Sequence, residues 1–527
     1  MIGAAERSAT RLLLPGFGAP NAGVWRLARL AAVVLAFWAV FALNPAFAER
    51  GGGDARPPKV SGGKRMQPLF ASKLPKIRVA RNQLGFVKED GSAFVPFGVN
   101  YFRPGTGWAP QVWKQFDPDA VRRDFQLLKS YGANCVRVFL SFGSFYEKPG
   151  VLSEDGLRKF DQFLKLADEA GLYVHPTGPD HWEGLPEWAR RDRIASEEIL
   201  QALEAFWRLF AARYRGVKTI FAYDLRNEPE VEWDNPTMRE RWKQWVKKQY
   251  GTAEKAASAW GMDVNSVRID DPPVPKPEDK PMDRLLLDYQ RFREDVADEW
   301  TRRQVEAIKS ADPDALVTVG FIQWSVPALL PGIRHYAAFS PMRQARFLDF
   351  LEIHFYPLER GMYQYQSEEE KNRNLAYLES VVREVARAGK PVVIAEFGWY
   401  GGGSVSQGGS KTKAASEEDQ ADWCSSLIEV TKGLACGWLN WGMYDHPEAG
   451  DVSQLTGLFT DQGKEKAWGR RFKELAAELT RKPLVRTKLG NRPELDWDRC
   501  ITSTKEGAEF RERYYKAFIS DKKTGPG

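Results

Sequence analysis

Hydrophobic positions recur in two alternating patterns between residues 77 and 480. Short runs rich in β-branched and aromatic residues predict strands, and longer stretches with apolar residues three or four positions apart predict helices. The short runs lie at 95–99, 135–140, 172–175, 219–225, 315–321, 348–356, 392–396 and 437–441. Each is followed by a helical stretch or a longer excursion. Eight such repeats predict an α/β fold, a closed parallel (βα)8 TIM barrel with its functional residues on the loops that follow the strands.

The predicted helices carry clear start and stop signals. The stretch 118–131 follows Asp117, a good N-cap residue, and stops at Gly132, while 153–170 stops at Gly171. Further helices are predicted at 196–214, 283–310, 368–388, 417–433 and 464–479. An open doubly wound sheet is the alternative, but no glycine-rich phosphate loop follows any strand. Pro176 interrupts the third run, so we expect that strand to be short.

Two additions to the simple barrel are predicted. Apolar stretches around Lys88-Glu89-Asp90-Gly91 indicate an N-terminal hairpin within 77–99. An insertion of roughly forty residues follows the fourth strand, with helical patterns at 239–250 and 253–260. We expect the insertion to stand over the mouth of the barrel, as a lid, a substrate wall or a neutral elaboration.

The two ends of the chain differ from this pattern. Four arginines precede the apolar run 30–43, and Ala46-Phe47-Ala48 resembles a cleavage site, so residues 1–48 are predicted to be a signal peptide for export to the periplasm or outside the cell. An uncleaved membrane anchor is the alternative. Residues 49–76 are predicted to be a flexible linker and 481–527 a basic, irregular tail, which leaves 77–480 as the catalytic barrel.

Charge distribution limits the partners. The chain has a net charge of +6, yet residues 481–527 alone hold twelve basic and seven acidic residues, and 77–480 carry more acids than bases. A net acidic core argues against a nucleic-acid groove and fits a neutral substrate, with membrane contact only through the signal segment. The oligomeric state is not predicted. Among four cysteines none has zinc-site spacing; Cys135 lies in an apolar run and predicts a buried thiol, and disulfides stay open.

The candidate chemistry begins with two glutamates, each of which ends an apolar run. Glu228 lies in Tyr-Asp-Leu-Arg-Asn-Glu-Pro and Glu396 in Val-Val-Ile-Ala-Glu-Phe-Gly. A carboxylate at the end of a hydrophobic strand is costly unless it is used. On the fourth and seventh strands of a barrel the two side chains would face each other, as the acid/base and the nucleophile of a retaining glycosidase. The alternative is that Asn227-Glu228-Pro229 only starts a turn or helix.

Other residues add to this interpretation. Arg137 lies inside an apolar run and needs an anion in a barrel interior. His354 and Tyr356 are two positions apart, on one face of a strand. The chain has 19 Trp, 17 Tyr and 30 Phe, which suits the apolar faces of sugar rings. Five histidines without an HExxH motif predict no metal and no cofactor, and no Gly-x-Ser-x-Gly indicates a serine nucleophile.

Several short motifs, in order, resemble glycoside hydrolase family 5 and the wider clan of retaining barrel glycosidases that includes family 42. The similarity covers about residues 77–479 and rests on Gly132-Ala133-Asn134-Cys135-Val136-Arg137, Asn227-Glu228-Pro229, His354-Phe355-Tyr356, Glu396-Phe397-Gly398 and Leu439-Asn440-Trp441-Gly442. The resemblance implies that Arg137 keeps Glu396 ionised, Asn227 bonds a sugar hydroxyl, and Tyr356 donates to the nucleophile. It further implies that His354 lies near the acid/base or the substrate and that Trp441 floors the sugar site.

The resemblance also leaves points open. The strand-three histidine of the family is matched by His175 or His181, and His181 lies nearer the expected loop. The implied substrate is a β-linked carbohydrate such as a β-glucan or β-mannan. The stretch Tyr250-Gly251-Thr252-Ala253-Glu254 in the insertion is similar to family 42 galactosidases, so a β-galactosidase-like exo-glycosidase is an alternative. A transglycosylase and a carbohydrate-binding barrel without turnover are further alternatives.

Overall fold

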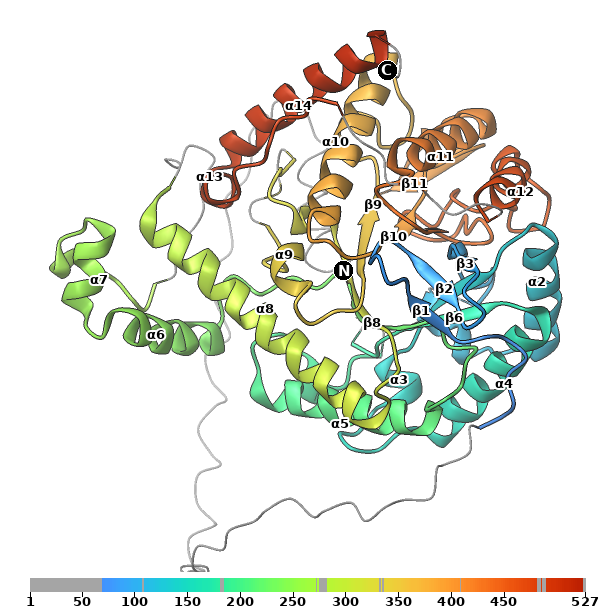
Figure 1. Cartoon of the computed structure of the whole chain (residues 1–527), viewed down its shortest axis with the longest axis horizontal. Coiled ribbons are helices and arrows are strands. Elements are labelled where there is room, and N and C mark those ends of the chain that lie inside the picture. Colours follow the sequence, from blue (N-terminus) through green and yellow to red (C-terminus); the bar gives the residue numbers. More distant parts are fainter. Residues whose placement is uncertain are drawn as a thin grey trace, which may run out of the picture.

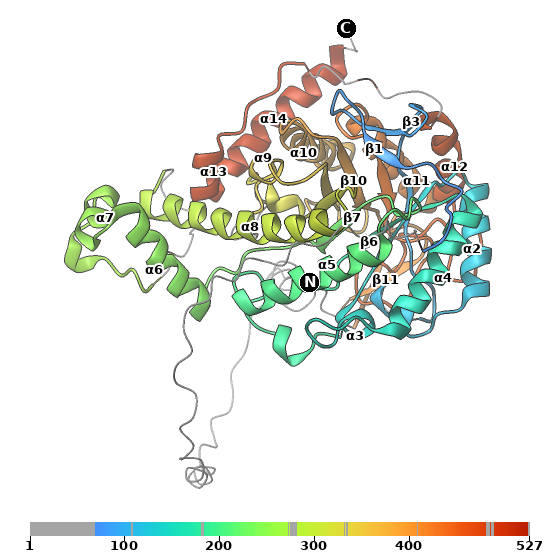
Figure 2. The same ribbon diagram turned by 60° about the horizontal axis from the view of Figure 1, so that its bottom comes forward.

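A computed structural model of the chain describes residues 69–106, 109–180, 184–271, 273, 282–330, 333, 336–407, 409–480, 485 and 490–524. Within these residues eight parallel strands close into a barrel surrounded by helices (Figures 1 and 2). The strands are β4 (Phe97–Asn100), β5 (Cys135–Phe139), β6 (Tyr173–Thr177), β7 (Tyr223–Asn227), β8 (Val317–Phe321), β9 (Leu351–Phe355), β10 (Val392–Phe397) and β13 (Trp438–Asn440). The predicted (βα)8 fold is confirmed.

The barrel helices begin and end close to the predicted signals. They are α2 (Pro118–Ser130), α4 (Glu154–Ala170), α5 (Glu197–Tyr214), α8 (Arg284–Ala311), α10 (Glu368–Ala386), α11 (Glu417–Thr431) and α12 (Ala467–Leu479). The side chain of Asp117 accepts from two backbone N–H groups at the start of α2, and Gly171 ends α4 in the left-handed conformation. Short helical turns complete the loops: η1 (Ala109–Trp113), α3 (Phe142–Phe145), η2 (Glu187–Ala189), η3 (Val264–Ser266), η4 (Gln323–Ser325) and α9 (Pro341–Gln344).

Strand β6 is longer than expected, because it continues through Pro176. On one side β6 pairs with β5 at every position, including Val138 with Pro176. On the other side its pairing with β7 is limited to Val174 with Ile220 and Thr177 with Asp224. Proline has no N–H to donate. The residue therefore fits at the point where the ladder toward β7 is already interrupted.

The predicted hairpin is part of a three-stranded antiparallel sheet, β1 (Ile77–Val79), β2 (Phe86–Lys88) and β3 (Ala93–Phe94). Phe86 packs edge-on against Phe221 and Phe350, which precede β7 and β9. The sheet thus covers the amino-terminal ends of the barrel strands, opposite the end where a (βα)8 site forms. Part of the expected linker also belongs here, since the Ser72 hydroxyl donates to Asp168 of α4.

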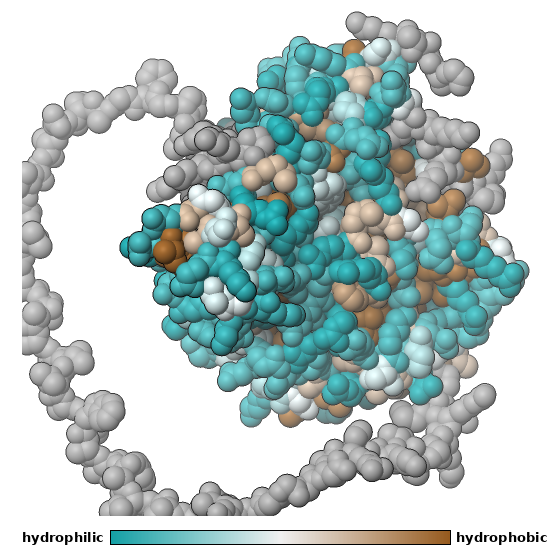
Figure 3. All heavy atoms as spheres, turned by 60° about the vertical axis from the view of Figure 1, so that its left-hand side comes forward, coloured by the Kyte–Doolittle hydropathy of each residue, from teal (hydrophilic) through white to brown (hydrophobic). Residues whose placement is uncertain are grey.

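The insertion forms α6 (Pro236–Tyr250) and α7 (Ala253–Trp260). Trp242 stacks on Trp260 and packs against Tyr289 and Phe292 of α8. The apolar face of the insertion is therefore buried against that helix. Figures 1 and 2 both show α6 and α7 beside the barrel, at the end of α8. Figure 3 shows this side as largely hydrophilic. The expectation that these helices stand over the mouth is therefore corrected.

We expected the C-terminal segment to be irregular, but part of it is helical. It contains α13 (Trp497–Thr502) and α14 (Thr504–Thr524), and α14 packs along α10 (Figure 1). Phe510, Tyr514 and Phe518 recur every four residues and are buried, which gives α14 one apolar face. The high density of charged residues between them hides this period in the sequence.

Residues 1–68, which include the predicted signal peptide, lie outside the described residues. Of the helices that the structure describes, none combines the length and the apolar character that a membrane crossing requires. The four cysteines are all buried free thiols, so the disulfides that the sequence left open are not formed.

Candidate active site

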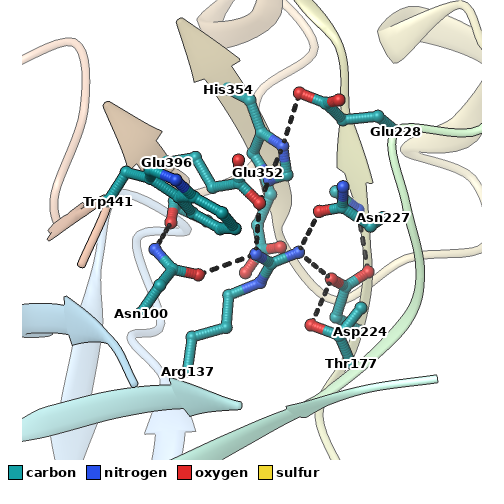
Figure 4. A network of polar contacts seen from close by, with 12 residues as sticks. Asn100, Arg137, Thr177, Asp224, Asn227, Glu228, Glu352, His354, Glu396 and Trp441 are labelled. Atoms are coloured by element: carbon teal, nitrogen blue, oxygen red, sulfur yellow. Dashed lines mark hydrogen bonds and ion pairs between the residues drawn. The ribbon is translucent and has the colours of Figure 1, made fainter. Parts of the chain in front are cut away.

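The carboxyl ends of the barrel strands bring the two candidate glutamates together. Glu228 directly follows β7 and Glu396 lies in β10. One carboxylate oxygen of each, together with a ring nitrogen of His354, lie within 4.8 Å of one another (Figure 4). Retaining glycosidases hold their two carboxyl groups about 5 Å apart, and inverting ones about 6.5–9.5 Å apart. The separation is therefore of the retaining kind.

Both glutamates sit on irregular backbone. The register of β10 against β9 shifts between Ile394 and Glu396, which marks a bulge. Glu228 has a φ of 45°, in the left-handed region that non-glycine residues rarely adopt. Its backbone N–H donates to Gly320 O at 2.8 Å, which anchors this conformation. Bulges and strained backbone change the direction of a side chain, and here one or the other occurs at each of the two predicted catalytic glutamates.

Arg137 of β5 links Glu396 to the polar side chains at the ends of the neighbouring strands. Its side chain is fully buried, and Nη1 donates to Glu396 Oε1 at 2.6 Å and to Asn100 Oδ1 at 2.8 Å. Nη2 donates to Asp224 Oδ2 at 2.7 Å and to Asn227 Oδ1 at 2.8 Å. The anion that a buried arginine requires is thus a pair of carboxylates, of which the sequence interpretation named one.

Asp224 and Asn100 are the site residues that sequence reasoning missed. Asp224 accepts from the Thr177 hydroxyl at 2.9 Å and from Gly320 N at 2.8 Å, so both of its carboxylate oxygens are hydrogen-bonded beside Arg137. Asn100 also donates to Ala395 O at 2.8 Å, next to the nucleophile candidate. A signal for Asn100 existed, since it ends an apolar run in the same way as the two glutamates.

The two glutamates differ in acidity. Burial raises the pKa of Glu228, and the nearby charge of Glu396 raises it further, to well above the usual value. Burial also raises the pKa of Glu396, but the Arg137 guanidinium and a hydrogen bond from Tyr356 oppose this effect and leave the pKa at about 7. Glu396 therefore ionises first while Glu228 keeps its proton, which is the order that a nucleophile and an acid need.

Strand β9 and the residue directly after it supply the predicted pair of neighbours, His354 and Tyr356. Tyr356 OH donates to Glu396 Oε2 at 3.0 Å, and His354 Nδ1 lies 3.1 Å from Glu228 Oε1. Burial and the Arg137 charge lower the pKa of His354 well below the usual value, so the ring is neutral. Behind the ring only a glycine fits at position 320, because a Cβ there would lie 2.9 Å from His354 Nε2.

Of the two candidates for the strand-three histidine, only His175 lies among the described residues. His175 of β6 is buried inside the barrel, where Nδ1 lies 2.8 Å from Ala222 O and Nε2 contacts Glu352. Burial lowers the pKa of His175, but the Glu352 charge outweighs this effect and raises it overall. His181, the preferred candidate, lies outside the described residues.

Trp441 follows β13, on the other side of Glu396 from Glu228 (Figure 4). Its indole Nε1 donates to the Ser453 hydroxyl at 3.0 Å. The ring packs against Phe102 at 5.2 Å and Phe139 at 5.7 Å between centroids. The side chain is 3% exposed, so it forms a buried aromatic wall of the site rather than a free surface.

Among the residues that the structure describes, Glu228, His354 and Glu396 form the one group with distances suited to a metal ion. Arg137 already places a positive charge on Glu396, and His354 and Glu228 face each other. A cation would have to compete with that guanidinium for its ligand. The arrangement favours chemistry by the two carboxyl groups themselves, one protonated and one ionised.

Replacing Tyr356 by phenylalanine tests the electrostatics of this site. The hydrogen bond to Glu396 lowers the pKa of that carboxyl, so its loss should raise the pKa. The nucleophile role expected for Glu396 requires its ionised form, so we expect activity to fall as the pH drops through the pKa of that carboxyl. The acidic limb of kcat/KM should therefore move to higher pH, and its maximum should fall about tenfold or more.

The control is Tyr146→Phe, because the Tyr146 hydroxyl donates to Ala202 O, away from the site. A pH profile of kcat/KM for both variants gives the answer. An acidic limb that stays in place or moves to lower pH in Tyr356→Phe would contradict the assigned hydrogen bond.

Comparison with known protein families gives a match over most of the chain. The family described as Cellulase (glycosyl hydrolase family 5) matches residues 87–447. This region contains the side chains of the site from Asn100 to Trp441.

Individual relatives are distant. β-Galactosidase BglY of Alicyclobacillus acidocaldarius is 23% identical over 283 residues, which cover 48% of this chain and 38% of that protein. Mannan endo-1,4-β-mannosidase F of Aspergillus clavatus is 24% identical over 172 residues, which cover 28% of this chain and 39% of that protein. The chain thus matches well under half the length of these relatives.

A solved structure shares the fold. A GH5_18 protein from Streptomyces cattleya, in complex with Manβ1-4GlcNAc, superposes with a TM-score of 0.56 at 18% identity. The match covers 81% of this chain and 92% of that one. At this identity the likeness concerns the fold alone.

Proposed function

Because the chain belongs to glycoside hydrolase family 5, we propose that it hydrolyses β-glycosidic bonds of a carbohydrate with retention of configuration. The observation that carries this proposal is the approach of the Glu228 and Glu396 carboxylates to within 4.8 Å. That distance leaves room for one anomeric carbon between them and none for a water molecule on the far face of the sugar.

In the first step Glu396, held ionised by Arg137, attacks the anomeric carbon. The bond to the glycosidic oxygen breaks, and that oxygen takes the proton of Glu228. The sugar is then an ester of Glu396. The bonds from Arg137 and Tyr356 to its oxygens position the carboxylate for attack and stabilise it when it leaves again.

In the second step the ionised Glu228 removes a proton from water, whose oxygen attacks the anomeric carbon and releases Glu396. His354 beside Glu228 stays neutral and holds that carboxyl in place through both steps. Two displacements restore the original configuration, and both glutamates return to their starting protonation states.

Asn227 is proposed to bind the sugar. Arginine can only donate hydrogen bonds, so the atom of Asn227 that faces Arg137 must be Oδ1. The amide NH₂ group is thereby turned away from the network. Next to Glu228, it is placed to donate to a hydroxyl close to the reacting carbon.

The substrate class proposed is a β-glucan or β-mannan, or an oligosaccharide from one of them. Relatives named as mannan endo-1,4-β-mannosidases support a β-mannosyl substrate. A β-galactosidase-like exo-glycosidase is the second candidate, favoured by the relatives named β-galactosidases.

A panel of aryl β-mannosides, β-glucosides and β-galactosides tests this proposal. We expect turnover of at least one of them, and proton NMR should show the β-anomer as the first product. An α-anomer formed first would contradict the retaining mechanism. Binding without turnover of any glycoside would identify a carbohydrate-binding barrel instead.

A further inference from the structure

The two sides of the candidate active site are covered to different degrees. On the acid/base side, Arg226, Asn227, Glu228 and Glu230 are all half-buried. On the opposite side, β13 and the residues that follow it, Trp441 to Met443, are buried. The side chains of Glu228 and Arg226 keep 8% and 11% of their surface exposed, so the described part of the site is covered on both sides, and more completely beyond Trp441.

The proposed mechanism indicates which part of the substrate lies on each side of the site. The leaving group must lie at Glu228, because that residue protonates its oxygen. Glu396, which must reach the anomeric carbon, lies between Glu228 and Trp441 (Figure 4). The non-reducing end of the bound sugar then points away from Glu228, toward Trp441 and Phe102. We name this the glycone side.

A loop covers the glycone side. Residues 442–456, the β13 loop, pass over Trp441, whose indole donates to Ser453. Val452 of the same loop packs against the cluster of Phe102, Phe139 and Trp441. His446 stacks on Phe102 with ring centroids 4.4 Å apart and planes at 28°. A second sugar on this side would have to occupy the volume of these side chains.

The β13 loop is held in place by buried polar contacts. Lys466 Nζ donates to both oxygens of Asp445, at 2.9 and 3.0 Å, and both side chains are almost fully buried. Gln454 bonds to β11 (Ser404–Gln407) of the β11–β12 (Ser410–Lys413) hairpin, accepting from Ser406 N at 2.6 Å and donating to Ser406 O at 2.9 Å. Opening the loop would strand a buried ion pair, which is costly.

We propose that the β13 loop restricts this enzyme to exo action, so that it removes single β-linked sugars from the non-reducing end of its substrate. The inference rests on the proposed function and names the part of the substrate that the site accepts. The loop also offers a group for a hydroxyl of a terminal sugar. His446 is 7% exposed and its Nε2 has no hydrogen-bond partner among the described residues.

Oligosaccharides test the inference. The aryl glycoside panel selects the sugar, and a β-linked pentasaccharide of that sugar, labelled at its reducing end, is then digested. We expect the monosaccharide as the sole early product and stepwise shortening of the labelled chain. The same pentasaccharide methylated on the 4-hydroxyl of its non-reducing end should react at least about a hundredfold more slowly.

The outcomes separate this inference from the proposed function. Early di- or trisaccharides, or efficient cleavage of the capped pentasaccharide, would overturn exo action while aryl glycoside turnover upheld the glycosidase. Failure of every aryl glycoside and oligosaccharide would overturn the proposed function, and exo action with it.

Two variants test whether the β13 loop itself restricts the substrate. Replacing Pro447–Asp451 by two glycines shortens the loop between its anchors, and Val452→Gly removes the side chain that packs on the aromatic cluster. In either variant that folds, the kcat/KM ratio of capped to uncapped pentasaccharide should rise about tenfold. The matched control is Glu448→Gln, an exposed residue of the same loop, for which the ratio should not change. An unchanged ratio in a folded loop variant would overturn the proposal.

Discussion

Glu396→Gln is expected to lower kcat by about 10⁴ to 10⁶ on every substrate, because the covalent intermediate can no longer form. The amide keeps the shape of the side chain and can still meet Tyr356, but it carries no charge toward the anomeric carbon. The effect should not depend on the leaving group, since attack is blocked whatever the departing oxygen requires. Steady-state kinetics on an aryl and an alkyl β-glycoside provide the measurement.

A smaller side chain makes the assignment sharper. In Glu396→Gly, azide can occupy the vacated space and attack the anomeric carbon from the face of the missing nucleophile. A β-glycoside should then yield the α-glycosyl azide, identified by NMR. Wild-type rates in Glu396→Gln, or a β-glycosyl azide from Glu396→Gly, would show that another group is the nucleophile. The exposed Glu448→Gln variant serves as the control.

Glu228→Gln is expected to cost about 10² to 10⁴ in kcat/KM on substrates with poor leaving groups. The proton that Glu228 keeps is what an alkyl or sugar leaving group needs. A dinitrophenyl glycoside needs no such proton, so its first step should stay fast while the second step, which lacks its base, becomes slow. The glycosyl ester on Glu396 should then accumulate and be visible by mass spectrometry of the intact protein.

The pH profile supplies an independent readout for the same variant. In the wild type, activity is expected to fall at high pH as Glu228 loses its proton, and the raised pKa of Glu228 should place this basic limb above the acidic limb set by Glu396. In Glu228→Gln the basic limb should disappear, and in the smaller variant Glu228→Ala azide should restore turnover with a β-glycosyl azide product. Equal losses on both kinds of leaving group would contradict the acid/base role.

Much of the fold was predictable because its signals are local. The N-cap of Asp117, the left-handed Gly171 and the period of apolar positions act within a few residues, and the helices end where these signals lie. The local signals were misleading where the deciding information came from a distant segment. Pro176 predicted a short strand, since nothing nearby shows that its missing N–H faces a gap in the ladder.

Parts of the site were predictable for a related reason. A charged residue at the end of an apolar run has few stable surroundings, so Glu228, Glu396 and Arg137 each indicated a use before any partner was known. The predicted bond from Tyr356 to Glu396 is present as well. Such predictions concern the surroundings that a single side chain requires, and the neighbouring residues in the sequence are enough to make them.

Which groups meet those requirements was decided only by the closed barrel. Arg137 and Glu396 are 259 positions apart, and Arg137 divides its donors between that carboxylate and Asp224, which no local pattern distinguishes from other acids. The left-handed backbone of Glu228, the placement of the insertion along α8 and the β13 loop across Trp441 arise in the same way. The sequence by itself determined which elements form and which side chains need partners. Tertiary structure decided the partners and which side of the site is more completely covered, because packing between distant segments, not local preference, sets those distances.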